Sequence, residues 1–255
     1  MNQLPESLGA LLTNLVDYAG LYPPAALSLP AALDNYKRYL ASPESWMLNR
    51  LVLPASKLGD VELGQNWRVT LLVENEPGSV PAQVETFETK QPNKLSLPTY
   101  CEAPLDRIKG SFAKVRTGGV TTDAVPMPSE IAEFLCQAAA RRVPFKATAG
   151  LHHPIRGDHP LTYLPASPHA IMHGFINVFV AAAFAWHGND RAAVIGVLHE
   201  CDPESFDFSD DALTWRDRRL TTEQIATARR DFAHNFGSCS FEEPVAGLRA
   251  LGWLR

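Results

Sequence analysis

Cysteine is scarce in this chain, and the few cysteines lie far apart. Four occur among 255 residues, and none belongs to a C-x-x-C pair; they are Cys101, Cys136, Cys201 and Cys239. This spacing is not that of a disulfide framework or of a structural zinc site with paired cysteines. We therefore expect reduced thiols and a cytoplasmic protein.

A marked excess of charge of one sign is also missing. The chain has 23 Lys and Arg residues against 28 Asp and Glu residues, with a formal net charge of -5 at pH 7 and a pI near 5.9. This balance leaves no broad basic surface along which a phosphate backbone could lie, so we expect no nucleic-acid partner. An anionic ligand would need a local cationic pocket instead.

Long hydrophobic runs are absent as well. The longest apolar stretch, residues 170–186, is interrupted by His173, Gly174 and Asn177. It is also shorter than the roughly 20 residues that a helix needs to span a bilayer. This stretch predicts a buried packing helix. We therefore expect no membrane partner. Residues 1–20 have no basic region before an apolar stretch and no small-residue cleavage site, so we also expect no signal peptide.

What the sequence does contain is a regular alternation of short strands and helices within one domain over residues 1–255. No repeat or linker divides it. Eight segments have the composition and the flanking turns of β-strands, and they are residues 12–18, 47–54, 67–74, 83–90, 98–103, 112–117, 144–150 and 234–240. Helical patterns follow the first, sixth, seventh and eighth strands, at residues 30–42, 129–142, 170–186 and 242–251.

This alternation predicts an α/β fold, namely a (β/α)8 barrel of the TIM type. The barrel is expected to be irregular, because the connections after the third and fourth strands are too short for full helices. An open doubly wound sheet is the alternative, although no G-x-G-x-x-G motif follows a strand. Residues 205–215 predict an inserted β-hairpin before the last strand. It would serve as a flap over the site or as a contact in a homo-oligomer.

Charged residues stand among the apolar residues of several predicted strands. Because side chains alternate across a strand, one set of them points into the barrel. That set, at or near the carboxyl ends of the strands, is Asp17, Glu88, Lys90, Glu102, Lys114, Arg116 and Lys146, and His152 is a further candidate. Thr148 shares the inward face of Lys146. Barrel enzymes carry their chemistry at these ends. Since an unpaired buried charge is costly, the set indicates either a reaction or a structural ion-pair network.

Two of these residues, Lys114 and Lys146, are predicted to face each other on neighbouring strands. Each ammonium disfavours charge on the other, and burial acts in the same direction. One of the two amines would then be neutral and nucleophilic near pH 7. This is the condition for forming a Schiff base with a carbonyl substrate.

The segments around the two lysines, AKVRTGGVTT (113–122) and FKATAGLHHP (145–154), resemble the motifs of a known family. They are similar to the lysine motifs on the sixth and seventh strands of class I aldolases of the deoxyribose-phosphate aldolase type. The resemblance implies that Lys114 forms the Schiff base and that Lys146 is the neighbour that favours its reactive form.

The same resemblance extends to the ends of three other strands. Asp17 stands where this family has an acidic residue in the first strand, and Glu88 or Glu85 stands where it has a proton shuttle on the fourth. The loop GSCS (237–240) is similar to its phosphate loop and implies an anion-binding role for three residues, which are Gly237, Ser238 and Ser240.

Arg116 stands where the family has a small hydroxyl residue, beside the proposed nucleophile. A planar guanidinium suits two-pronged binding of a carboxylate. We therefore expect a small anionic carbonyl substrate, such as an oxo acid, rather than a sugar phosphate. Lys90, Thr148 and His152 complete the residues expected to bind it.

Two other functions are compatible with the same residues. One is a metal-assisted or acid–base barrel isomerase or hydrolase that uses the carboxylates and His152. The other is a non-catalytic barrel in which the charges form a structural network. The histidines include no H-E-x-x-H motif, so for the favoured lyase we expect neither a metal nor another cofactor.

Overall fold

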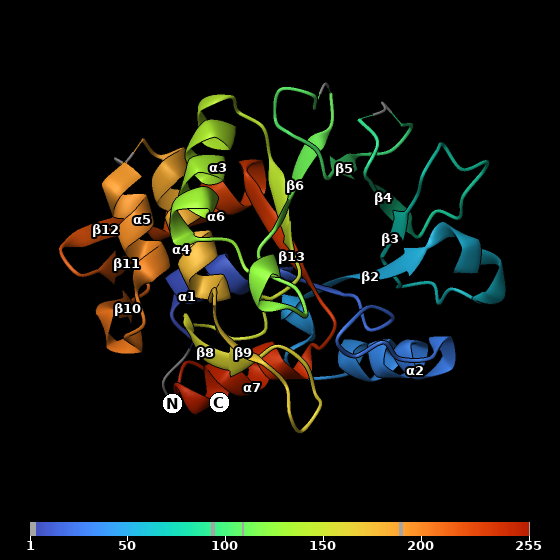
Figure 1. Cartoon of the computed structure of the whole chain (residues 1–255), viewed down its shortest axis with the longest axis horizontal. Helices are drawn as coiled ribbons and strands as arrows, with labels where there is room; N and C mark the ends of the chain where they lie inside the picture. The colour runs from blue at the N-terminus through green and yellow to red at the C-terminus, as the bar shows by residue number, and fades with distance from the viewer. Residues whose placement is uncertain (1–3, 93–94, 109, 189–190, 255) are drawn as a thin grey trace.

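The computed structural model describes residues 4–92, 95–108, 110–188 and 191–254. Eight parallel strands close into a barrel (Figure 1). In barrel order they are β1 (Val16–Tyr18), β2 (Leu48–Pro54), β3 (Val69–Leu72), β4 (Val84–Thr89), β5 (Thr99–Cys101), β6 (Phe112–Arg116), β7 (Phe145–Thr148) and β13 (Ala233–Ser238). The predicted (β/α)8 barrel is confirmed, and each of its strands overlaps a predicted one.

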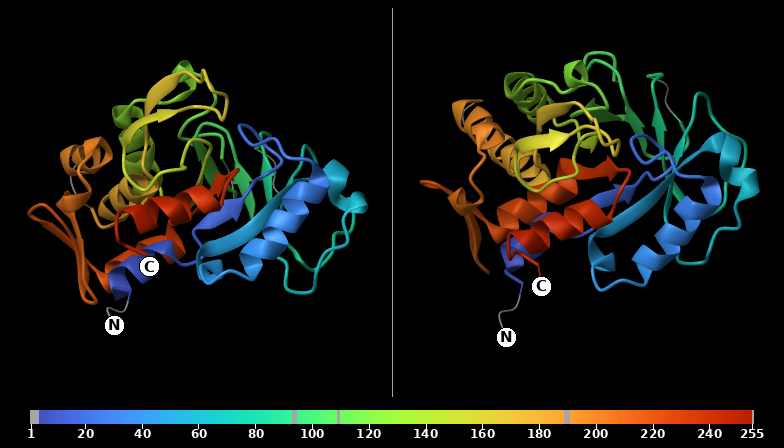
Figure 2. Two further views of the ribbon diagram at one scale, coloured as in Figure 1. Left: turned by 90° about the horizontal axis from the view of Figure 1, so that it is seen from below. Right: turned by 60° about the horizontal axis from the view of Figure 1, so that its bottom comes forward.

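Helices surround the barrel unevenly. The α-helices of the described residues are α1 (Glu6–Leu12), α2 (Leu29–Leu40), α3 (Pro128–Ala140), α4 (Phe175–Trp186), α5 (Arg191–His199), α6 (Thr222–Asp231) and α7 (Glu242–Ala250). The connection from β2 to β3 holds only the 3-10 helix η2 (Ala55–Asp60), and the described residues from β3 to β6 hold no helix. Figure 2 shows loops on this side of the barrel, where the sequence predicts short or missing helices.

The remaining short elements lie in the connections. Three further 3-10 helices are η1 (Ser45–Met47), η3 (Thr122–Ala124) and η4 (Pro203–Ser205). Within the described parts of the chain, no helix is both long and apolar enough to span a bilayer.

The apolar stretch 170–186 contains two kinds of structure. Its first residues belong to β9 (His169–Met172), which pairs antiparallel with β8 (Gly157–Pro160). We call this hairpin the β8–β9 arm. Gly174 then turns the chain into α4 where a side chain would collide with the carbonyl oxygen of Pro154, because an added Cβ would lie 2.4 Å from that atom. From Phe175 to Ala185 every residue of α4 is buried, as predicted for a packing helix.

The first strand is shorter than the sequence indicates. The predicted strand over 12–18 begins inside α1, and only residues from Val16 onward pair with the barrel. Asn14, which has a φ of 51°, marks the break between the two. Asparagine tolerates this left-handed conformation better than most residues.

The insertion before the last strand is a three-stranded sheet rather than a simple hairpin. β10 (Phe206–Phe208) pairs with β11 (Ala212–Trp215) as predicted, and β12 (Arg218–Thr221) adds a third strand. The sheet packs beside α1 and α5 (Figure 1). None of its residues lines the pocket described below, so the expected role as a flap over that pocket is wrong.

Candidate functional site

The predicted charged residues meet inside the barrel. Lys114 and Lys146 are direct partners in the register between β6 and β7. The fully buried Lys146 amine donates hydrogen bonds to Asp17 on β1 and to Glu88 on β4. Glu88 bridges the two lysines, because its other oxygen, Oε2, lies 2.8 Å from Lys114 Nζ. The Lys114 amine also lies 3.3 Å from Oε2 of Glu102.

Charge is retained at the buried end of this cluster. Burial lowers the pKa of Lys146, but the carboxylates of Asp17 and Glu88 outweigh it and raise that pKa above its ordinary value. Burial likewise favours the neutral form of Glu88, yet Lys146 and Lys114 bring the pKa of Glu88 down to about 2. Lys146 is therefore the charged member of the pair, and a carboxylate separates the two amines.

A pocket of about 450 Å³ lies above this cluster, at the carboxyl ends of the strands. Lys114 lines the pocket, whereas Lys146 lies beneath it. The Lys114 side chain keeps 9% of its surface exposed and that of Lys146 only 1%. The tertiary structure thus gives only one of the two amines access to a ligand in this pocket.

The other predicted binding residues divide into two groups. Those that line the pocket are Glu88, Lys90, Glu102, Arg116, Thr148, His152 and Gly237. Ser238 and Ser240 are not among the lining residues. Ser238 Oγ accepts a hydrogen bond from the Ser240 backbone, and Ser240 Oγ accepts one from the backbone of Glu243. These two hydroxyls therefore hold the loop together at the start of α7.

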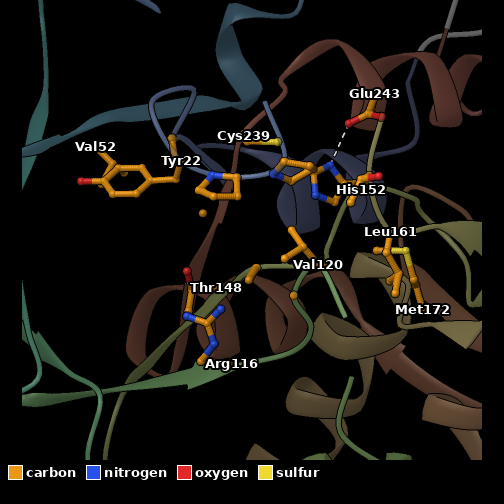
Figure 3. Close-up of a pocket in the computed structure, with 18 of the residues that line it drawn as sticks. Tyr22, Val52, Arg116, Val120, Thr148, His152, Leu161, Met172, Cys239 and Glu243 are labelled. Carbon is orange, nitrogen blue, oxygen red and sulfur yellow. Dashed lines mark hydrogen bonds and ion pairs between the residues drawn. The ribbon is translucent and has the colours of Figure 1, made fainter. Parts of the chain in front are cut away.

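Arg116 lies at the rim of the pocket, two residues beyond Lys114. About half of its side chain is exposed, and its closest carboxylate oxygen, on Glu102, is 4.0 Å away. Figure 3 places Arg116 beside Thr148 on one side of the pocket. Much of the guanidinium thus remains available to an anionic group of a ligand.

Glycines allow the loops after β6 and β7 to touch. A Cβ on Gly118 would lie 2.8 Å from Gly150 Cα, and Gly150 has a φ of +79°. Thr117 Oγ1 reinforces the contact by donating to the Ala149 carbonyl oxygen at 2.6 Å. The T-G-G and T-A-G segments that follow the lysines are therefore explained by this close approach of two backbones.

Two site residues that the sequence did not indicate complete the opposite wall. Glu243 in the first turn of α7 accepts hydrogen bonds from Tyr163, in the connection of the β8–β9 arm, and pairs with His152. Figure 3 shows the His152–Glu243 contact across the pocket from Arg116. No local motif links these residues, because they are 80 and 91 positions apart in the chain.

The neighbouring histidine has a different environment. His153 stacks on His159 of the arm, with 3.5 Å between the ring centroids. Burial, followed by the two adjacent histidines, lowers the pKa of His153 to about 4, so this ring is neutral at pH 7. Among the described residues, no group of three or more His, Cys, Asp or Glu side chains is placed to hold a metal ion.

The fold and the pocket define a (β/α)8 barrel in which Lys114, but not its partner Lys146, lines a pocket above a buried charge cluster. No protein-family model, no curated protein and no solved structure matches the chain.

Proposed function

We propose that the protein is a lyase of the class I aldolase type, in which Lys114 forms a Schiff base with a small anionic carbonyl substrate. The observation that carries this proposal is the difference between the two paired lysines. The amine of Lys114 reaches the pocket, and the amine of Lys146 is enclosed by two carboxylates. Lysine amines in dry sites or next to another cationic group are the nucleophiles of imine-forming enzymes, and Lys146 is the cationic neighbour of Lys114.

Proton acceptors for this step lie beside the amine. Glu102 Oε2 is buried, contacts Lys114 Nζ at 3.3 Å and has no hydrogen-bond partner in the described structure. In the proposed reaction the amine nitrogen bonds to the carbonyl carbon. Two of the three ammonium protons, carried by Glu102, leave with the carbonyl oxygen as water. A protonated imine remains on Lys114, and Lys146 keeps its positive charge below it.

The charges at the rim support an anionic substrate. Lys90 and Arg116 both line the pocket, and the carboxylate nearest to Arg116 is at the limit of ion-pair distance. A substrate carboxylate could bind the guanidinium through two parallel hydrogen bonds. Its carbonyl group would then lie toward Lys114, two residues deeper on β6.

Reduction of the imine tests the proposal directly. The protein is incubated with pyruvate, glyoxylate or glycolaldehyde in the presence of borohydride, and the modified peptide is located by mass spectrometry. We expect a stable adduct on Lys114 and none on Lys146. A Lys114→Met variant should remain folded and form no adduct. Failure of the wild-type protein to give an adduct with any oxo acid or aldehyde of such a panel would contradict the proposal.

An acid–base isomerase or hydrolase is a second candidate, because His152 and Glu243 form a close pair in the same pocket. Such an enzyme would not need a covalent bond to lysine. Turnover by Lys114→Met with any substrate that the wild-type protein converts would favour this second function over the first.

A further inference from the structure

The wall opposite Arg116 contains a polar cluster that Schiff-base formation does not require. It consists of His152, Glu243, Tyr163 and Cys239, all of which line the pocket (Figure 3). His152 comes from the loop after β7, Tyr163 from the β8–β9 arm, and Glu243 from α7. Three separate segments of the chain therefore build this wall.

Glu243 is fixed as the acceptor of the cluster. Its Oε2 lies 2.7 Å from His152 Nδ1 and receives the Tyr163 hydroxyl at 2.8 Å. Burial favours its neutral form, but the contacts with His152 and Tyr163 prevail and lower the pKa of Glu243. An ionised carboxylate only accepts hydrogen bonds, so Nδ1 of His152 must carry a proton. In the neutral ring Nε2 is then the basic nitrogen.

The other groups of the wall are less suited to move a proton near neutral pH. Burial raises the pKa of the Cys239 thiol, whose sulfur lies 3.6 Å from the Tyr163 hydroxyl. Burial also raises the pKa of Tyr163, and the neighbouring Cys239 and Glu243 add to this shift. His153 is held neutral against His159. His152 is thus the group whose second nitrogen is left without an assigned partner among the described residues.

We propose that His152 is the acid–base residue for carbon–carbon bond cleavage, an inference that rests on the proposed function. The substrate that this arrangement fits is an oxo acid with a hydroxyl group on the carbon β to the imine carbon, that is, an aldol of an oxo acid. Its carboxylate would lie toward Arg116, its carbonyl carbon at Lys114 and its hydroxyl toward His152.

The step balances with the groups named. His152 Nε2 takes the proton of the substrate hydroxyl, and the oxygen electrons form the carbonyl group of a leaving aldehyde. The carbon–carbon bond breaks, and its electron pair moves into the protonated imine on Lys114 to give a neutral enamine. Condensation is the reverse, in which protonated His152 returns the proton to the new alkoxide.

Tyr163 and Glu243 act as positioning residues in this proposal. The Tyr163 hydroxyl occupies the same carboxylate oxygen as the imidazole, so it restricts where Glu243 can hold the ring. Since Tyr163 lies on the arm, the arm contributes to the site through a hydrogen bond as well as through the pocket-lining residues Leu161 and Met172.

The experiment separates imine formation from cleavage of the carbon–carbon bond. Three quantities are measured: the borohydride adduct of pyruvate on Lys114, exchange of the pyruvate methyl protons in heavy water, and cleavage of the aldol of pyruvate with acetaldehyde. For His152→Gln we expect adduct formation and exchange within about two-fold of the wild-type protein, and cleavage slower by at least about a hundred-fold. Tyr163→Phe should slow cleavage by roughly ten-fold.

Two controls make the outcome decisive. His169→Gln alters an exposed histidine of the same arm, paired with Asp158 at 3.5 Å, and should behave like the wild-type protein in all three assays. Lys114→Met should lose all three activities. Unchanged cleavage by His152→Gln, or equal loss of exchange and cleavage, would overturn the role of His152. A wild-type adduct without any aldol cleavage would also overturn it while leaving the lysine adduct established, whereas absence of the wild-type adduct overturns the proposed function itself.

Discussion

The two ends of the barrel both hold charged clusters, yet they are built from different cations. At the carboxyl end, Lys114 and Lys146 share Glu88. At the amino end, Arg50 and Arg68 share Glu85, with N–O distances of 2.8 and 3.0 Å, at a second pocket of about 530 Å³. The two clusters thus have the same pattern of two cations on one carboxylate.

Arginine and lysine differ in what they can do in such a cluster: arginine can only stabilise the fold, whereas lysine can also react. A guanidinium does not lose its proton at any pH that a folded protein experiences, so it cannot act as a nucleophile. A further guanidinium at the amino end, that of Arg229, donates hydrogen bonds to four backbone carbonyls of the chain around β1 and β13. Lysine can lose a proton, and Lys114 faces a pocket beside a carboxylate oxygen of Glu102 that accepts no hydrogen bond in the described structure.

Buried acceptor atoms without a hydrogen bond occur at both ends, but their chemistry differs. At the amino end the amide oxygens of Asn49 and Asn235 are buried without a partner. An amide does not titrate, so it cannot carry a proton between a ligand and a lysine. The comparison therefore predicts that substitutions at the amino end change stability alone, and that those at the carboxyl end also change reactivity.

The largest expected effect on stability comes from Lys146→Met. It would leave Asp17 buried without its lysine, and it would remove one of two cations from Glu88. Breaking a buried ion pair by removing one partner costs about 3–5 kcal/mol. We expect the free energy of unfolding in urea to fall by this amount, and Lys57→Met, which changes an exposed lysine, to have little effect. A fully stable Lys146→Met would remove the structural role assigned to Lys146.

The ionised Glu88 of the carboxyl-end cluster should also make the free energy of unfolding depend on pH. Lys146 and Lys114 hold the pKa of Glu88 at about 2 in the folded protein, below its ordinary value of 4.5. A depressed carboxyl pKa stabilises the folded state above the unfolded pKa, and this stabilisation is lost as the pH falls toward 2. We expect Glu88 to contribute up to about 1.4 kcal/mol per pH unit in that window. The slope should be smaller for Glu88→Gln, and equal slopes in the two proteins would contradict the prediction.

Arg229→Met tests the amino end. It would leave four carbonyl oxygens without their shared donor, among them those of Leu11 and Ala233. We expect the free energy of unfolding to fall by about 2–3 kcal/mol, because buried polar groups would lose hydrogen bonds. Adduct formation at Lys114 should be unchanged. The adjacent Arg230, which is exposed and paired with Asp231, provides the matched control Arg230→Met. Loss of the adduct in folded Arg229→Met would break the separation between the two ends.

The smallest expected effect belongs to Glu85→Gln. Burial opposes its charge, but Arg68 and Arg50 prevail and lower the pKa of this carboxyl. About a third of its side chain remains exposed, so solvent screens the pairs and we expect a loss of only about 0.5–1 kcal/mol. Thermal unfolding of this variant should therefore resemble that of the wild-type protein, and borohydride trapping should proceed to the same extent. Reduced trapping would mean that Glu85 acts at a distance on the lysine site.

Much of the barrel could be predicted because its strands follow local rules. The segment that became β6 shows the alternation of period two, with Ala113 buried on one side and Lys114 directed to the site. Helix α6 was not predicted, because only Ile225 and Ala228 are buried in it. Two apolar residues are too few to show a helical period in the sequence. The β8–β9 arm was not predicted, because β9 lies directly before the apolar sequence of α4 and the two read as one apolar stretch.

The site could be predicted only in part. Lys114, Lys146, Glu88 and Asp17 were found because a charge within an apolar strand is visible in the sequence itself. Glu243 was not found, because a glutamate in the first turn of a helix is ordinary on electrostatic grounds alone. Its role depends on contacts with chain segments that are remote in sequence.

The sequence by itself determined the strands, the faces of their side chains and the pairing of two lysines on neighbouring strands, because these follow from short-range periodicity and chain order. Only the tertiary structure decided which lysine reaches the pocket, which carboxylate bridges the pair, and which residues oppose Arg116. Closure of the barrel brings β1, β4 and α7 together around β6 and β7. The contacts between these elements depend on the packing of the whole domain, so they cannot be predicted from a local sequence pattern.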